Sequence, residues 1–210
     1  MVVVNHLRTP SLDEDVAEEI VDIEKKYYSS QDEIMYGLFK TIDLFTSVWN
    51  KLFRRRLVEN IRNENYARSQ DWDYCFKVFL KINNIVKIEN CLYFWVNRPS
   101  SAVNSANFVQ ILAKCKTSMF YRNYVELPAD KKKYSHYLLD GLYRLIIDFE
   151  DKLYGNKALK DIEKHCRTII AKTWMNYLRC KEIPANKKVS RLCRAVFPRL
   201  SHHLFSGNRN

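Results

Sequence analysis

The chain has 210 residues, of which 47% are hydrophobic, and it carries a formal net charge of +11. It contains no run of about eighteen apolar residues, which excludes a membrane-spanning helix, and its short apolar start does not fit a signal peptide. With only four glycines and five prolines, the composition predicts an all-α protein, a single helical bundle or array of about seven to nine helices.

The charge is unevenly distributed. Residues 11–33 carry nine acids against two lysines, a net of −7, so the remainder carries +18. A body this basic suits an acidic partner, such as nucleic acid, an anionic membrane or the acidic surface of a microtubule. The six cysteines are dispersed and form no C-x-x-C pair, which predicts reduced core residues of a cytoplasmic protein.

The first half of the chain is expected to be helical after a frayed start over residues 1–10. Ser11 can cap a first, acidic helix whose apolar stripe runs to Tyr27. The sequence Ser30-Gln31-Asp32-Glu33 is a capping-box pattern, and apolar residues at helical spacing extend the second helix to Leu52. A further helix is expected from Ser69 or Asp71, is broken at Asn83-Asn84 and resumes over 85–96.

The second half continues the helical pattern after a polar loop over residues 98–107. Helices are predicted over 108–127, 130–155, 157–179 and 187–197. The helix over 130–155 has apolar residues on two adjoining strips, so it should lie at the centre of the bundle; its water-facing side should carry His136, Asp140, Arg144 and Asp148. One domain is predicted over residues 11–205, followed by a disordered tail over 206–210.

Three groups of cations are candidates for contact with an acidic polymer. They follow the second helix, open the central helix and line one side of the last helix: Arg54, Arg55, Arg56; Lys131, Lys132, Lys133; and Lys187, Lys188, Arg191, Arg194. A partner protein is expected to cover an apolar face made by Ile34, Leu38, Phe45, Trp49, Phe76, Phe79 and Trp95.

Motifs for catalysis are not found. The sequence has no phosphate-cradling glycine loop and no H-E-x-x-H, and His165-Cys166 are neighbours that point in different directions on a helix. We therefore expect no enzyme activity, no cofactor and no metal site.

The order of the motifs resembles a known family. QDEIMYGLF with Trp49 after it, Tyr121-x-x-Tyr124-Val125, LLDGLYRLI and EKHCRTIIAKTWMNYL before a basic last helix resemble the C-terminal helical domain of the katanin regulatory subunit, over about residues 30–204. The usual regulatory subunit also carries a WD-repeat propeller, which is not found here, and the acidic first helix does not match the family.

The resemblance implies a non-catalytic, all-helical regulatory domain. It would form a heterodimer with the N-terminal helical domain of the catalytic AAA ATPase subunit and bind microtubules through basic residues. It would then act in microtubule severing at the cytoskeleton and spindle. The residues leave two alternatives open: a helical nucleic-acid-binding module and a cytokine-like four-helix bundle.

Overall fold

The structure is a computed structural model that describes residues 1–9, 22–41, 43–44, 46–62, 64–96, 108–153, 156–157 and 159–197. Two compact units divide the chain. Unit 1 comprises Met1–Tyr66 and Gln70–Ser105, and unit 2 comprises Ala67–Ser69 and Ala106–Asn210. The single domain expected over residues 11–205 stays a prediction, and each unit is described by itself.

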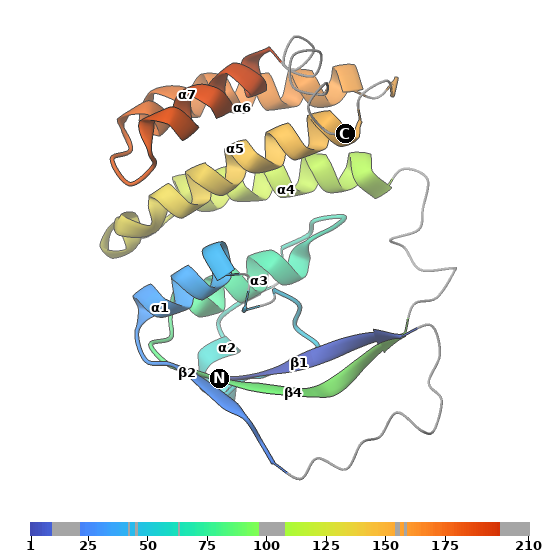
Figure 1. Cartoon of the computed structure of the whole chain (residues 1–210), viewed down its shortest axis with the longest axis vertical. Helices are drawn as coiled ribbons and strands as arrows, with labels where there is room; N and C mark the ends of the chain where they lie inside the picture. Colours follow the sequence, from blue (N-terminus) through green and yellow to red (C-terminus); the bar gives the residue numbers. More distant parts are fainter. Residues whose placement is uncertain are drawn as a thin grey trace. The chain divides into compact units, whose positions relative to one another are not determined.

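Unit 1 contains a four-stranded mixed sheet with the strand order β2-β4-β1-β3. Figure 1 shows β2, β4 and β1 of this sheet. The strands are β1 (Val2–Thr9), β2 (Lys25–Tyr28), β3 (Lys51–Leu52) and β4 (Ile85–Val96). Strand β1 runs parallel to β4, whereas β1 with β3 and β2 with β4 are antiparallel.

The sheet contradicts the all-α prediction, which is therefore wrong. Residues 2–9, expected to be frayed, form β1; the segment 25–28, expected to end a helix, forms β2; and residues 85–96, expected to be helical, form β4. Residues 85–96 are rich in β-branched and aromatic side chains, which suit a pleated strand. Short apolar runs fit a helix face or a strand equally well. Pairing with distant residues therefore determines that these segments form strands.

Short helices accompany the sheet. Helix α1 (Gln31–Tyr36) continues as the π-helix η2 (Gly37–Thr41), and α2 (Arg55–Val58) and α3 (Gln70–Phe79) follow. The hydroxyl of Ser30 caps α1 by accepting a hydrogen bond from the Glu33 N–H at 3.2 Å. The helix expected to reach Leu52 ends at Thr41, and residues 51–52 pair with β1 instead.

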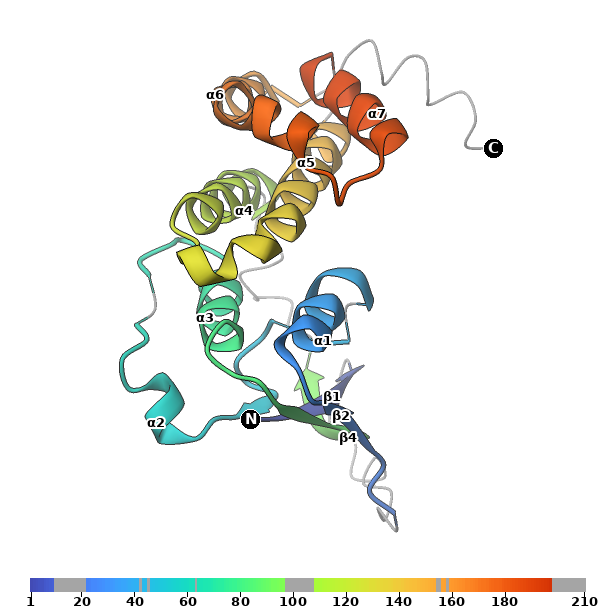
Figure 2. The same cartoon turned by 90° about the vertical axis from the view of Figure 1, so that its left-hand side faces the viewer.

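The two faces of the sheet differ. Helices α1 and α3 cover one face, here called the inner face (Figures 1 and 2). Buried side chains of Val3, Tyr28 and Ile85 belong to this face. Successive residues of a strand point to opposite faces, so Val2, Leu52 and Val86 point to the outer face, where each is at least partly exposed.

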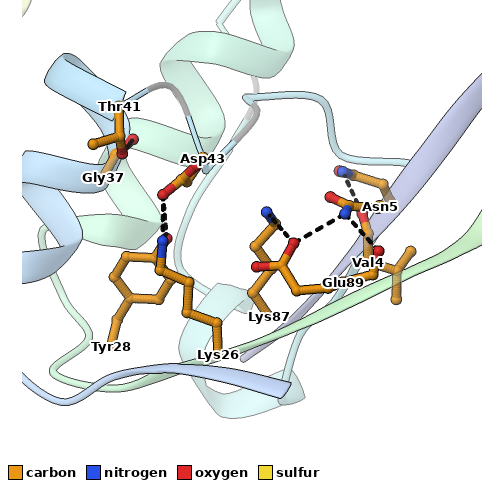
Figure 3. A network of polar contacts seen from close by, with 10 residues as sticks. Val4, Asn5, Lys26, Tyr28, Gly37, Thr41, Asp43, Lys87 and Glu89 are labelled. Carbon is orange, nitrogen blue, oxygen red and sulfur yellow. Dashed lines mark hydrogen bonds and ion pairs between the residues drawn. The ribbon is translucent and has the colours of Figure 1, made fainter. Parts of the chain in front are cut away.

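Polar side chains on the inner face tie the strands to the loop that follows η2 (Figure 3). The Lys26 ammonium pairs with Asp43 at 2.5 Å, and the buried Lys87 ammonium pairs with Glu89 at 2.7 Å. The Asn5 amide also donates to the Glu89 carboxylate at 3.0 Å. Because the buried Lys87 is paired in this way, its charge avoids an uncompensated desolvation cost; the Lys26–Asp43 pair is more exposed.

Unit 2 is helical. It comprises α4 (Phe108–Val125), the 3-10 helix η4 (Ala129–Tyr134), α5 (Ser135–Lys152), α6 (Leu159–Arg179) and α7 (Ala185–Val196). Helix α5 contacts α4, α6 and α7, so the helix predicted to be central lies among three helices of this unit, although the single all-helical bundle expected around it is not formed. The Tyr143 ring of α5 stacks on the Tyr177 ring of α6 with centroids 3.9 Å apart.

One residue expected to face water on α5 is buried. Asp140 forms ion pairs with Arg191 of α7 and, at 3.5 Å, with Arg144 of α5. Arg194 of α7 also pairs with Asp151 at 2.8 Å. Two ion pairs therefore hold α7 against α5, which is why a carboxylate can occupy the buried side of the central helix.

Candidate anion-binding site

A hollow of about 500 Å³ lies on the outer face of the sheet in unit 1. It is lined by two arginines, a lysine, two asparagines and apolar side chains, and none of its described lining residues is acidic: Met1, Val2, Leu52, Phe53, Arg54, Arg56, Leu57, Lys81, Ile82, Asn83, Asn84 and Val86. We call this feature the basic hollow.

The strand register builds the floor of the basic hollow. Val2 of β1 is paired with Leu52 of β3 on one side and with Val86 of β4 on the other. Val86 is paired in turn with Tyr27 of β2, so one apolar row crosses all four strands on the outer face. At the ends of this row Leu52 is 71% exposed and Tyr27 is 62% exposed.

The turn after β3 forms one wall of the hollow. Arg54 precedes α2 in an extended conformation with φ −69° and ψ 128°, and its carbonyl accepts the Leu57 N–H at 2.9 Å. Arg54 and Arg56 line the hollow, whereas Arg55 does not, and all three are exposed. Long cationic side chains on a short helix next to an apolar floor keep their charges in water.

The turn between α3 and β4 forms the other wall. The Lys81 N–H donates to the Val78 carbonyl at 2.9 Å, and the Gln31 amide donates to the Leu80 carbonyl at 2.7 Å. These bonds fix the end of α3, from which Lys81, Asn83 and Asn84 reach the hollow. Their ammonium and amide groups add donors for an anion opposite the arginines.

A buried lysine of β3 anchors this strand on the inner face of the sheet. Lys51 points to the inner face, where its ammonium donates to the Ser47 carbonyl at 2.6 Å and to the Asn50 side chain at 2.7 Å. Burial lowers the pKa of Lys51 to about 8, although the nearby Cys75 and Asp71 act in the opposite direction. Because these bonds anchor the loop before β3, they help to fix the positions of Leu52 and Arg54.

The other predicted cations lie in unit 2, and the structure gives them different roles. Lys131, Lys132 and Lys133 belong to η4, where Lys131 pairs with Asp130 at 3.4 Å. Of the α7 group, Lys187 is exposed and the Lys188 ammonium donates to the Leu178 carbonyl at 2.9 Å. Arg191 and Arg194 form the ion pairs with α5, so their charge is compensated within the unit.

The apolar residues predicted to meet a partner lie mostly inside unit 1. Ile34, Leu38, Phe76 and Phe79 are buried, so as placed they form the core beneath α1 and α3. The Trp49 ring is partly exposed and lies against the Tyr93 ring at 4.4 Å and the His6 ring at 4.8 Å. Phe45 and the side chain of Trp95 lie outside the described part of the chain.

Sequence reasoning missed Lys81, Asn83 and Asn84 as site residues. The asparagine pair predicts a break between two helical segments, but α3 already ends at Phe79 and the residues after the pair form β4. The alternation of Ile85 and Lys87, which are buried, with the more exposed Val86 is the signal that could have revealed the strand.

The arrangement offers cationic donors to an anion. Guanidinium groups match the geometry of phosphate and carboxylate oxygens, and the hollow supplies no carboxylate that would repel them. Among the described residues, no group of three or more His, Cys, Asp or Glu is placed to hold a metal ion. Likewise, none of the described helices is long and apolar enough to cross a bilayer.

Comparison of the chain with protein families, with characterised proteins and with solved structures finds no match. The resemblance to the katanin regulatory subunit therefore stays a hypothesis, and the sheet of unit 1 contradicts the all-helical fold that this resemblance implies.

Proposed function

We propose that the protein is a non-catalytic module that binds single-stranded nucleic acid on the outer face of the sheet in unit 1. The observation that carries this proposal is the basic hollow, which Arg54, Arg56 and Lys81 line with no acidic residue among the described lining residues. These three cations would contact the phosphate backbone.

The apolar row beside the cations supports a single strand as the ligand. Exposed bases are bound by stacking on aromatic side chains and by apolar contact, and Tyr27 offers an exposed ring at one end of the row. A duplex hides its bases, so it would use the cations but not the row. We therefore expect single strands to bind more tightly than duplexes of the same length.

The test is fluorescence anisotropy with labelled single-stranded DNA, single-stranded RNA and duplex DNA of mixed sequence. Arg54→Glu with Arg56→Glu should weaken single-strand binding about tenfold or more, because two phosphate contacts become repulsive. For wild type, three phosphate contacts predict a slope of about −2 in a plot of log K against log salt concentration.

The matched control is Lys132→Glu with Lys187→Glu, which reverses two exposed cations of unit 2. It has the same net charge as the double arginine variant. This variant should bind within about twofold of wild type if the site is local rather than a property of total charge. Equal losses in both variants would contradict the proposal. Co-sedimentation with microtubules but no binding to nucleic acid would instead favour the scaffold function expected from the sequence.

A further inference from the structure

The end of α6 and the start of α7 carry exposed apolar side chains next to exposed cations. We call residues 172–189 the α6–α7 corner. Trp174, Met175 and Leu178 lie on the outward side of α6, and Trp174 is 42% exposed. Val189, near the start of α7, is 60% exposed. Large apolar side chains that gather on one surface mark a contact site more often than isolated ones do.

The two helices bring these residues to one end of the pair. Residues 180–184 connect α6 to α7, and the Lys188 ammonium donates to the Leu178 carbonyl at 2.9 Å. This bond ties the start of α7, and with it Val189, to the last turn of α6. Figures 1 and 2 show the connection at one end of the paired helices.

The charge of the corner is almost entirely positive. It carries five cations, Lys172, Arg179, Lys181, Lys187 and Lys188, against the single acid Glu182. Further along α7, Arg191 and Arg194 pair with α5, whereas Lys181 and Lys187 are exposed. The corner therefore combines a positive field with a surface that gains from leaving water.

We propose that the α6–α7 corner binds the surface of an anionic lipid bilayer. The cations would lie at the level of the acidic headgroups, and Trp174, Met175, Leu178 and Val189 would enter the interface below them. Tryptophan favours this boundary because its ring is apolar and its N–H is polar. Each cation near such a surface adds attraction that falls off within a Debye length.

The shape favours a bilayer over a partner helix. A partner helix needs a groove that surrounds its apolar face, whereas the exposed apolar side chains of the corner come from the last turns of α6 and the first turns of α7. A soft, flat surface can meet such a projection without any complementary groove. This inference concerns unit 2 alone and does not rest on the proposed binding of nucleic acid by unit 1.

The experiment is sedimentation of the full chain with vesicles of phosphatidylcholine, with and without phosphatidylserine. Wild type should bind the anionic vesicles and not the neutral ones, with a blue shift of tryptophan fluorescence. Lys181→Glu with Lys187→Glu should weaken binding about tenfold or more, since two attractive charges become repulsive. Trp174→Ser with Leu178→Ser should reduce both binding and the blue shift.

The matched control is Lys160→Glu with Lys164→Glu, which reverses two exposed cations at the other end of α6. It should bind within about twofold of wild type, because its charges lie beyond the screening length from the corner. Circular dichroism establishes that each variant is folded, and the charge variant keeps the test valid if the apolar variant unfolds. No binding to anionic vesicles, equal losses in the control, or binding of an acidic amphipathic peptide in place of vesicles would overturn the proposal.

Discussion

The ion pair between Asp140 and Arg191 gives the sharpest test of how unit 2 is held together. The Asp140 side chain is only 7% exposed, and Arg191 provides its contact from α7. Arg191→Met keeps much of the apolar stem but removes the charge. Stranding a buried charge costs about 3–5 kcal/mol. Since Arg144 stays 3.5 Å from Asp140, we expect a loss of about 2–3 kcal/mol.

Arg194→Met is the matched control, because the Arg194–Asp151 pair joins the same two helices but is more exposed, at 26% and 31% of the side-chain surfaces. Exposed pairs contribute about 0–1 kcal/mol, so this variant should lose less than 1 kcal/mol. The assay is urea unfolding followed by circular dichroism, which reports mainly on the long helices of unit 2. If the two variants lose the same stability, the buried pair does not hold α7 in place.

Three further predictions concern single residues. Gly141→Ala should destabilise the protein by about 1–3 kcal/mol, because its Cβ would lie 2.6 Å from the Phe120 ring; an unchanged melting temperature would contradict this close contact of α4 and α5. Glu150 is 4% exposed, and burial, followed by Glu163 and Asp151, raises its pKa to about 8. The Glu150 carboxyl therefore keeps a proton in the folded state that it releases in the unfolded state above its ordinary pKa of 4.5. Stability should thus fall as the pH rises from about 5 to 8. The melting temperature of Glu150→Gln should not show this fall over the same pH range. A profile that runs parallel to that of the wild type would contradict the raised pKa of Glu150. Burial lowers the pKa of Lys51 to about 8 from 10.5, so Lys51 should make stability increase between about pH 8 and 10; Lys51→Met should remove that increase in urea titrations.

Much of unit 2 could be predicted from the sequence because its helices are long and strongly periodic. The stripe that includes Leu138, Leu142 and Phe149 identified α5, and its wide apolar sector correctly placed it among several neighbours. The position of Asp140 was predicted wrongly because helical periodicity takes account only of residue polarity. It contains no information that Arg191, 51 positions later, pairs with this carboxylate.

Unit 1 could not be predicted in the same way because its sheet depends on distant pairing. Strands β1 and β4 are more than eighty positions apart, and parallel pairs carry no hairpin turn that the sequence could show. The first strand was overlooked because a short apolar start resembles a frayed end. Once it was overlooked, β4 had no partner, and helix was the simpler interpretation of its apolar residues.

Only part of the candidate site could be predicted from the sequence. The three consecutive arginines after β3 could be recognised as candidates, since a single helix end cannot use all three charges. Lys81 became a site residue only when the register placed Val86 beside Val2 and Leu52. The sheet thus selects Arg54 and Arg56 from the triplet and joins them to a lysine from another turn.

The most direct measurement is an NMR titration of the ¹⁵N-labelled protein with a short single-stranded oligonucleotide. We predict saturable shifts confined to the amides around the basic hollow, at Val2, residues 52–57 and residues 81–86, and at Tyr27 on the same face. Shifts spread evenly over the cationic residues of both units, or none at all, would contradict it.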